Sequence, residues 1–195
     1  MSERGVERIR RTARRIGACT TRGELGSVLG EEAGRYTLHD LQRIGGGIKR
    51  EVDPLPEPYR SQVRPYFEAQ IFGAYHRLMH AHRSGSFRSM DDPIADPDRF
   101  KEFAALIEEG CLRESGKSGT DFGFSDPLHS LFYYLVTGYL MFVENGPGHP
   151  VGTPFPGGFV VEQRGDEYFC PIRDKEQDVP FSICNVCPAH QMEGV

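Results

Sequence analysis

A run of glycine and proline divides this chain of 195 residues into two unequal parts. Residues 146–159 read GPGHPVGTPFPGGF, with five glycines and four prolines in fourteen positions. Proline lacks the N–H group that helices and central strands require, and glycine loses the most conformational entropy when either element fixes it. We therefore expect no regular element in this run, and we expect the chain to change character across it.

Helical patterning dominates the residues before the run. Apolar side chains recur at three- and four-residue spacing, Thr20-Thr21 with Glu24 is typical of a capping box, and Asp126-Pro127 is typical of a helix entry. A helix that begins near residue 37 is weakened by glycines at 45–47. The other expected helices cover residues 6–16, 21–29, 59–83, 98–112 and 128–143.

After the run, apolar residues alternate on both sides of Arg164-Gly165-Asp166, which predicts a β-hairpin over residues 159–170. The expected fold class is mainly α. A helical body, residues 1–145, carries a small irregular module, residues 146–195, which contains the Gly/Pro loop, the hairpin and a cysteine cluster. We expect the module to pack on the body as one compact unit.

Three of the five cysteines lie in the C-terminal module. Cys184 and Cys187 form a C-x-x-C pair, and Cys170 precedes Cys184 by fourteen positions. Loops rich in glycine and proline let several thiolates converge, and thiolates bind zinc and iron–sulfur clusters. Because Cys170 and Cys187 are each followed by proline, as in some ferredoxins, we favour an iron–sulfur (4Fe-4S) cluster over Zn²⁺.

A tetrahedral site needs a fourth ligand. Cys111 is the first candidate, because it would tie the predicted helix 98–112 to the module. His190, three residues after Cys187, and His149, inside the Gly/Pro loop, are the alternatives. Arg173 would place a positive charge beside the site.

Other readings of these residues stay open. One alternative is that the cysteines serve only as small buried hydrophobic side chains. A thioredoxin-like redox pair is disfavoured, because no βαβ pattern precedes the C-x-x-C. A metal-dependent enzyme would instead have a cleft lined by His129, His149 and Arg173, with one coordination position open to substrate.

Charge and hydropathy exclude several classes of partner. The net charge is −5, so no global basic field favours nucleic acid, and the arginine-rich residues 4–15 read as a solvated or partner-facing helix. The longest apolar run, residues 128–143, is short for a membrane span. The first residues lack the apolar segment of a secretory signal, so we expect a cytoplasmic protein with free thiols.

The C-terminal half resembles domain-of-unknown-function family 2115, an uncharacterised family of methanogenic archaea. The resemblance covers roughly residues 98–195 and rests on four motifs: PLH at 127–129, GHPVGTPFPGG at 148–158, YFCPIRDK at 168–175 and CNVCPA at 184–189. It implies an anaerobic cytoplasm, in which an iron–sulfur cluster would persist, and it brings no established activity.

The hypothesis from sequence is a non-enzymatic accessory metalloprotein of methanogen metabolism. Its cluster or zinc, held by Cys111, Cys170, Cys184 and Cys187, would act structurally or as a redox sensor at a surface that docks a protein partner. The metal-dependent enzyme and a purely structural zinc module are the two alternatives.

Overall fold

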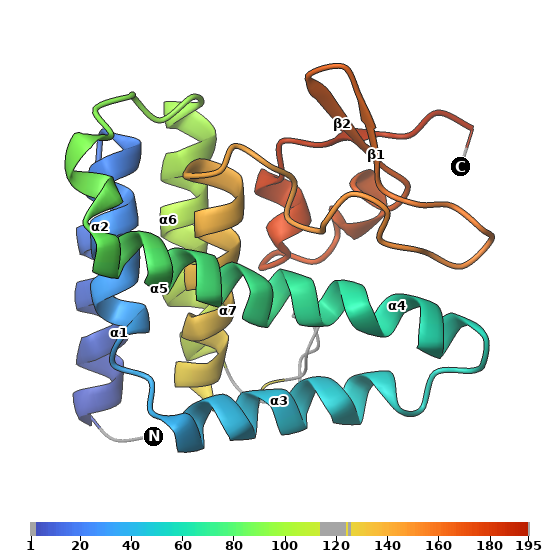
Figure 1. The fold of residues 1–195 in the computed structure, drawn as a ribbon, viewed down its shortest axis with the longest axis horizontal. Coiled ribbons are helices and arrows are strands. Elements are labelled where there is room, and N and C mark those ends of the chain that lie inside the picture. Colours follow the sequence, from blue (N-terminus) through green and yellow to red (C-terminus); the bar gives the residue numbers. More distant parts are fainter. Residues whose placement is uncertain (1–2, 114–123, 125, 195) are drawn as a thin grey trace.

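The fold is a helical body with a small sheet-containing module beside it, as the computed structural model shows for residues 3–113, 124 and 126–194 (Figure 1). The prediction of a mainly α protein is confirmed. The body contains α1 (Glu3–Gly17), α2 (Arg22–Ala33), α3 (Leu38–Val52), α4 (Tyr59–Glu68), α5 (Ala74–Ser84), α6 (Pro97–Leu112) and α7 (Pro127–Phe142). A short 3-10 turn, η2 (Ser86–Ser89), follows α5.

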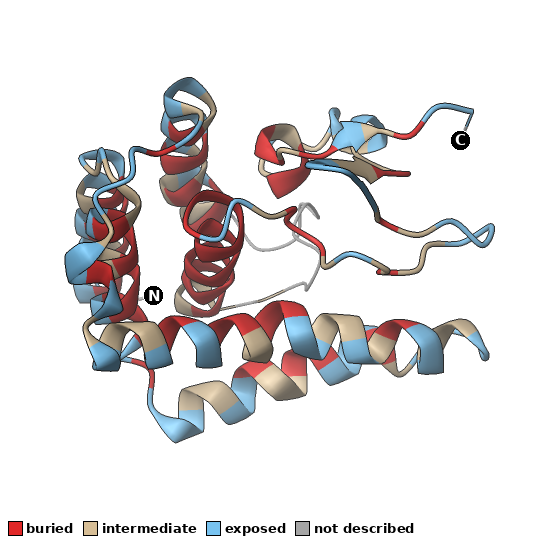
Figure 2. Ribbon diagram, turned by 45° about the horizontal axis from the view of Figure 1, so that its top comes forward, coloured by how far each residue is buried: buried red, intermediate tan, exposed pale blue. Residues whose placement is uncertain are grey.

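Helix α7 is the centre of the body. Every residue from His129 to Phe142 is buried, so this helix has no solvent-facing stripe. Helices α2, α5 and α6 pack around it, and α1 packs against α6 (Figure 2). The expected buried helix at 128–143 is therefore confirmed.

The capping signals are confirmed as well. The Thr21 side chain accepts a hydrogen bond from the Glu24 N–H, and the Glu24 carboxylate accepts from the Thr21 N–H, which completes the capping box of α2. Asp126 caps α7 by accepting from the Leu128 N–H at 3.0 Å.

The helix predicted over residues 59–83 is one helical run with an irregular turn inside it. Between α4 and α5 the chain forms a π-helical turn, η1 (Ala69–Gly73). A π turn inserts an extra residue into the helical repeat and rotates the side chains that follow it. Gln70, inside this turn, is fully buried.

Helix α3 runs without interruption through the glycines at 45–47, so it is more regular than the sequence predicted. The packing supplies the reason. A Cβ atom at Gly47 would lie 3.0 Å from the Phe124 ring, and one at Gly45 would lie 3.4 Å from the Phe72 ring. Close approach of aromatic rings therefore offsets the entropic cost of glycine in this helix.

The arginine-rich helix α1 is docked rather than free. Arg8 pairs with the buried Glu32, Arg15 lies 2.5 Å from Glu31, and Arg10 lies 2.9 Å from Glu108. These ion pairs turn part of the basic face toward α2 and α6.

The C-terminal module holds a three-stranded sheet among its described residues. The predicted hairpin is present as β1 (Glu162–Arg164) antiparallel to β2 (Glu167–Cys170). A strand that the sequence did not predict, β3 (His190–Gln191), pairs parallel to β2 and places the tail beside Cys170. Two 3-10 turns lie between β2 and β3: η3 (Asp174–Glu176) and η4 (Ile183–Val186).

Helices α6 and α7 hold the module. The turn η4 packs on α6, and the Tyr134 hydroxyl on α7 donates to the Phe181 carbonyl at 2.9 Å. The guanidinium of Arg113 lies 5.1 Å from the centre of the Phe181 ring.

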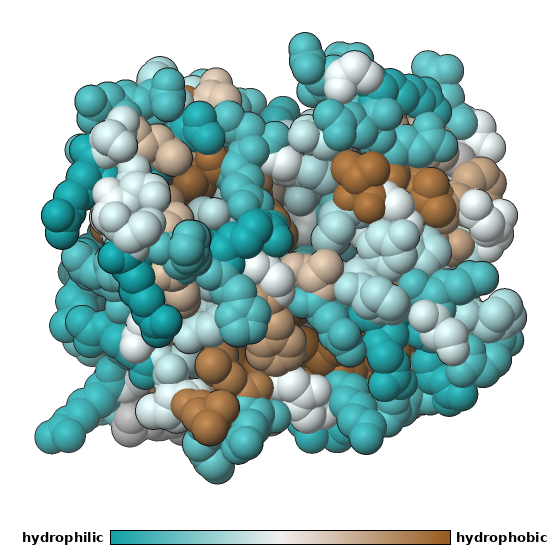
Figure 3. Space-filling view, in the orientation of Figure 1, coloured by the Kyte–Doolittle hydropathy of each residue, from teal (hydrophilic) through white to brown (hydrophobic). Residues whose placement is uncertain are grey.

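Hydrophilic side chains predominate on the face shown in Figure 3, and apolar ones are confined to small patches. Among the described helices, none combines the length and the apolar character needed to cross a bilayer.

Candidate functional site

Cys170, Cys184 and Cys187 line one small cavity inside the C-terminal module. Cys170 ends β2, Cys184 lies within η4, and Cys187 follows η4 directly. All three are buried, with exposed fractions of 3–6%. The cavity volume is about 10 Å³, which is close to the space that a single water molecule requires.

A tight turn sets the spacing of the C-x-x-C pair. The Ser182 hydroxyl accepts from the Cys184 N–H at 3.2 Å, and the Cys187 N–H donates to the Cys184 carbonyl at 3.2 Å. This geometry turns the chain within one 3-10 turn, so residues 184 and 187 reach the same cavity.

Backbone amides donate to two of the sulfur atoms. Cys170 Sγ accepts from the N–H groups of Ile172 and Arg173. Cys187 Sγ accepts from the N–H group of Ala189 and from that of Gly148, whose nitrogen lies 3.4 Å from the sulfur. In each case the proline after the cysteine has no N–H to offer, and the amide of the next residue turns back to the sulfur. Such donors stabilise a thiolate.

Burial works against these donors. It raises the pKa of the Cys170 thiol to about 11, while the Ile172 and Arg173 amides and the Arg173 guanidinium act in the opposite direction. Burial likewise raises the pKa of Cys187, and the Gly148 and Ala189 amides oppose that shift. Both sulfurs are therefore thiols at neutral pH unless a metal ion binds beside them.

Gln70 connects the helical body to this cavity. Its amide nitrogen donates to the Gly148 carbonyl oxygen at 2.8 Å, and the N–H of Gly148 donates to Cys187. Gln70 Oε1 is buried with no hydrogen-bond partner among the described residues. The sequence did not single this residue out, although a glutamine beside Phe67 and Ile71 is a polar residue next to an apolar helical stripe.

His149 and Arg173 also line the cavity, together with Pro147, Val161, Ile183 and Ala189. His149 is 6% exposed, and its ring meets the Phe155 ring edge to face, with centroids 5.8 Å apart. Of the fourth ligands considered from sequence, His149 is the one that the structure places with the three cysteines.

Cys111 does not reach this site. It is buried in the last turns of α6, and the described residues that line the cavity do not include it. Burial strongly raises its thiol pKa. The connection between body and module that was expected of Cys111 is made by Tyr134, Arg113 and Phe181 instead.

The remaining predicted residues are also elsewhere. His190 is exposed on β3, its ring lies tilted against the Phe169 ring with centroids 5.7 Å apart, and its Nε2 lies 3.7 Å from Glu167 Oε1. His129 is in the first turn of α7, 3.9 Å from Asp126, and burial lowers its pKa. Of the three residues named for the enzyme alternative, His149 and Arg173 line the described cavity and His129 does not.

In the part of the chain that the structure describes, the side chains around the cavity do not form a closed ligand set. Within the described ranges, no three Cys, His, Asp or Glu side chains converge closely enough to hold one ion. The cavity thus gathers a suitable set of donors without placing them at ligation distances.

Comparison with known proteins assigns the chain to a family. A family described as an uncharacterized protein conserved in archaea, domain-of-unknown-function family 2115, matches residues 21–192. The chain belongs to this family. The resemblance inferred from the C-terminal motifs is confirmed, and the match extends through most of the helical body.

Several relatives of the chain are UPF0305 proteins from methanogens. A UPF0305 protein of Methanopyrus kandleri is 32% identical over 136 residues, which cover 70% of this chain and 86% of that protein. A UPF0305 protein of Methanocaldococcus jannaschii is 23% identical over 167 residues, 84% of this chain and 92% of the relative. One from Methanothermobacter thermautotrophicus is 47% identical over 57 residues, 29% of this chain and 37% of the relative. No solved structure matches the chain.

Proposed function

We propose that this protein is an accessory metal-binding protein whose site is formed by Cys170, Cys184, Cys187 and His149. The observation that carries the proposal is the cavity itself, because three cysteines and one histidine from three separate segments line it. Three sulfurs and one imidazole are a common ligand set of structural zinc sites. Ligation requires these side chains to turn toward the cavity centre.

The size of the cavity favours a single ion over a cluster. A volume of about 10 Å³ holds one atom-sized occupant, whereas a four-iron cluster would require the walls to move apart. We therefore place Zn²⁺ ahead of the iron–sulfur cluster, which reverses the preference drawn from the Cys-Pro pairs. The cluster remains the second candidate.

The surroundings suit a thiolate-bound cation. Backbone N–H groups already point at Cys170 and Cys187. Three thiolates and one Zn²⁺ carry a net charge of −1, and the Arg173 guanidinium at the same cavity balances it. Groups that contact the ligands rather than the metal orient those ligands and tune their affinity for the metal.

The role that follows is structural. His149 comes from the Gly/Pro loop, Cys170 from the hairpin, and the C-x-x-C pair from the turn before the tail. A shared ion would cross-link these segments, which otherwise have little regular structure, and would fix the surface that they present to a protein partner. An enzyme role needs an open coordination position, and burial of all four side chains argues against one.

The test is purification under anaerobic conditions, followed by zinc, iron and sulfide analysis and an absorption spectrum. The proposal predicts one zinc per chain in the wild type and in the Cys19→Ser control, which removes a cysteine that does not line the cavity. Cys184→Ser and Cys187→Ser should each lose most of the metal. Metal-free wild-type protein with an ordered C-terminal module would refute the proposal.

A further inference from the structure

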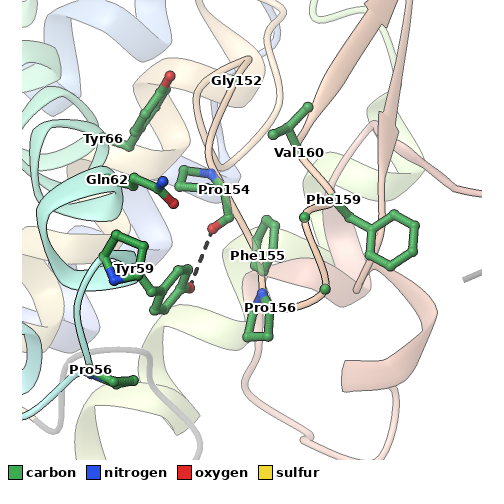
Figure 4. Close-up of a pocket in the computed structure, with 13 residues that line it drawn as sticks. Pro56, Tyr59, Gln62, Tyr66, Gly152, Pro154, Phe155, Pro156, Phe159 and Val160 are labelled. Carbon is green, nitrogen blue, oxygen red and sulfur yellow. Dashed lines mark hydrogen bonds between the residues drawn. The ribbon is translucent and has the colours of Figure 1, made fainter.

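A hollow against α4 is a second candidate site, next to the cysteine cavity but distinct from it. It lies between α4 and residues 152–160, in and just after the Gly/Pro loop, and has a volume of about 680 Å³ (Figure 4). Small-molecule sites fall in the range of about 300–1,000 Å³. Its size therefore suits a ligand larger than a solvent molecule or an ion.

The wall of this pocket is fixed by hydrogen bonds. The Gly152 N–H donates to the Val161 carbonyl at 2.7 Å, and the Phe155 N–H donates to the Phe159 carbonyl at 2.8 Å. On the helix side, the Tyr59 hydroxyl donates to the Pro154 carbonyl at 3.3 Å (Figure 4). The loop is thus joined to α4, so the hollow is formed before any ligand arrives, which lowers the ordering cost of binding.

The chemistry of the lining selects an uncharged ligand. The described lining residues include no Asp, Glu, Lys, Arg or His. They offer the rings of Tyr59, Tyr66 and Phe155 and the amide of Gln62. A charged group would find no opposite charge to pair with among these residues, whereas a flat ring can stack on their aromatic faces.

We propose that this pocket binds an uncharged molecule that carries a planar aromatic ring. The ring would stack against Phe155 and the tyrosines, and the Gln62 amide would donate to or accept from a polar atom at the ring edge. This occupant is matched to the neutral, aromatic lining and to the volume of the hollow.

The pocket is also joined to the cysteine cavity, an inference that rests on the proposed metal site. Phe155 lines the pocket, and its ring meets His149 of the cavity edge to face, at 5.8 Å and an interplanar angle of 87°. A ligand that stacks on Phe155 favours one position of that ring and hence one position of His149. Ligand and Zn²⁺ are therefore coupled, and each changes the affinity for the other by the same factor.

The test uses indole as the probe, with negatively charged indole-3-acetate for comparison, in saturation-transfer NMR titrations. We expect saturable binding of indole and weaker binding of the acetate. Gln62→Trp fills the pocket from an exposed helical position, so it should weaken indole binding about tenfold or more, which is about 1.4 kcal/mol. Val151→Ser, an exposed residue of the same loop outside the lining, is the control and should bind like wild type.

Several results would overturn the proposal. The proposal fails if indole shows no saturable binding, or if Gln62→Trp binds indole as tightly as the wild type does. It also fails if the wild type is a dimer that Gln62→Trp dissociates, because a second copy of the chain would then fill the pocket. The titration is repeated on zinc-loaded and chelator-treated protein. Equal indole affinities in the two forms would refute the coupling between indole and zinc, and would leave the pocket itself unaffected. If the protein takes up no zinc, the coupling fails together with the proposed function. Indole binding then still tests whether the pocket takes an aromatic ligand.

Discussion

The Gln70 side chain donates from its amide nitrogen to the Gly148 carbonyl oxygen at 2.8 Å, across the boundary between the helical body and the C-terminal module. The same glycine donates its N–H to Cys187 Sγ at 3.4 Å. Gln70 therefore holds the peptide that points at a candidate ligand. The irregular turn η1 places Gln70 at this boundary, and π turns often occur at functional sites.

Replacing Gln70 should weaken metal binding without removing a ligand. In Gln70→Leu the Gly148 carbonyl loses its buried partner and the Gly148 N–H is no longer held toward Cys187. We expect zinc affinity to fall roughly 10- to 100-fold, as is typical when a group that positions a metal ligand is lost. Competition with a chromophoric chelator measures the zinc affinity of each variant. Glu68→Gln, an exposed change on the same helical run, should keep the wild-type affinity, and equal affinities in both variants would contradict this role.

Glycine has opposite roles at positions 148 and 46. A Cβ atom at Gly148 would lie 2.7 Å from Ile183 Cδ1, so Gly148→Ala should destabilise the fold by about 1–3 kcal/mol through overpacking. At Gly46, inside α3, the nearest atom would be the end of Arg50 at 3.7 Å, so Gly46→Ala should add about 0.5–1 kcal/mol through helix propensity. Urea unfolding of the two variants checks both signs, and a destabilised Gly46→Ala would contradict the helical account of α3.

Cys19 should react slowly for a half-exposed cysteine. Its thiol donates to the Arg15 carbonyl, and burial, with the nearby Glu24 carboxylate, raises its pKa to about 11. The thiolate fraction then grows roughly tenfold for each pH unit up to that value. Iodoacetamide labelling followed by peptide mass spectrometry at several pH values measures the rate at Cys19. A rate that levels off near pH 8.5, as for an ordinary thiol, would show that the raised pKa is wrong.

His129 should make the protein less stable in mild acid. Burial lowers its pKa in the folded state below the ordinary 6.5, and Asp126 only partly opposes this shift. The unfolded chain therefore binds the proton more readily, so the free energy of unfolding falls as the pH drops through about 6.5 toward the folded-state pKa. His129→Gln should lose this part of the pH dependence in urea unfolding curves. His39→Gln, at an exposed position, should retain it, and identical curves for wild type and His129→Gln would contradict the prediction.

Local sequence patterns predicted much of the fold and part of the site. Helical periodicity, the Thr21 capping box and the Asp126 cap placed helices that the structure contains, because these signals depend on residues within one or two turns. The C-x-x-C spacing and the hairpin ending at Cys170 likewise indicated three sulfurs that share a cavity.

Contacts between distant segments escaped the same reasoning. Cys111 was the first candidate for a fourth ligand because it would have tied its helix to the module. Its side chain is instead buried within the body, and His149 from the Gly/Pro loop lines the cavity. Strand β3 has two residues and too little pattern to predict. The contact of Gln70 with Gly148 joins residues 78 positions apart, and nothing in the local sequence specifies such a pairing.

X-ray absorption at the zinc edge of the purified, metal-loaded protein tests the central claim most directly. The account predicts one zinc per chain with three sulfurs at about 2.3 Å and one nitrogen at about 2.0–2.1 Å. Loss of one sulfur from the first shell in Cys170→Ser would support the assignment further. A shell of oxygen and nitrogen atoms, or protein that binds no zinc at all, would contradict it.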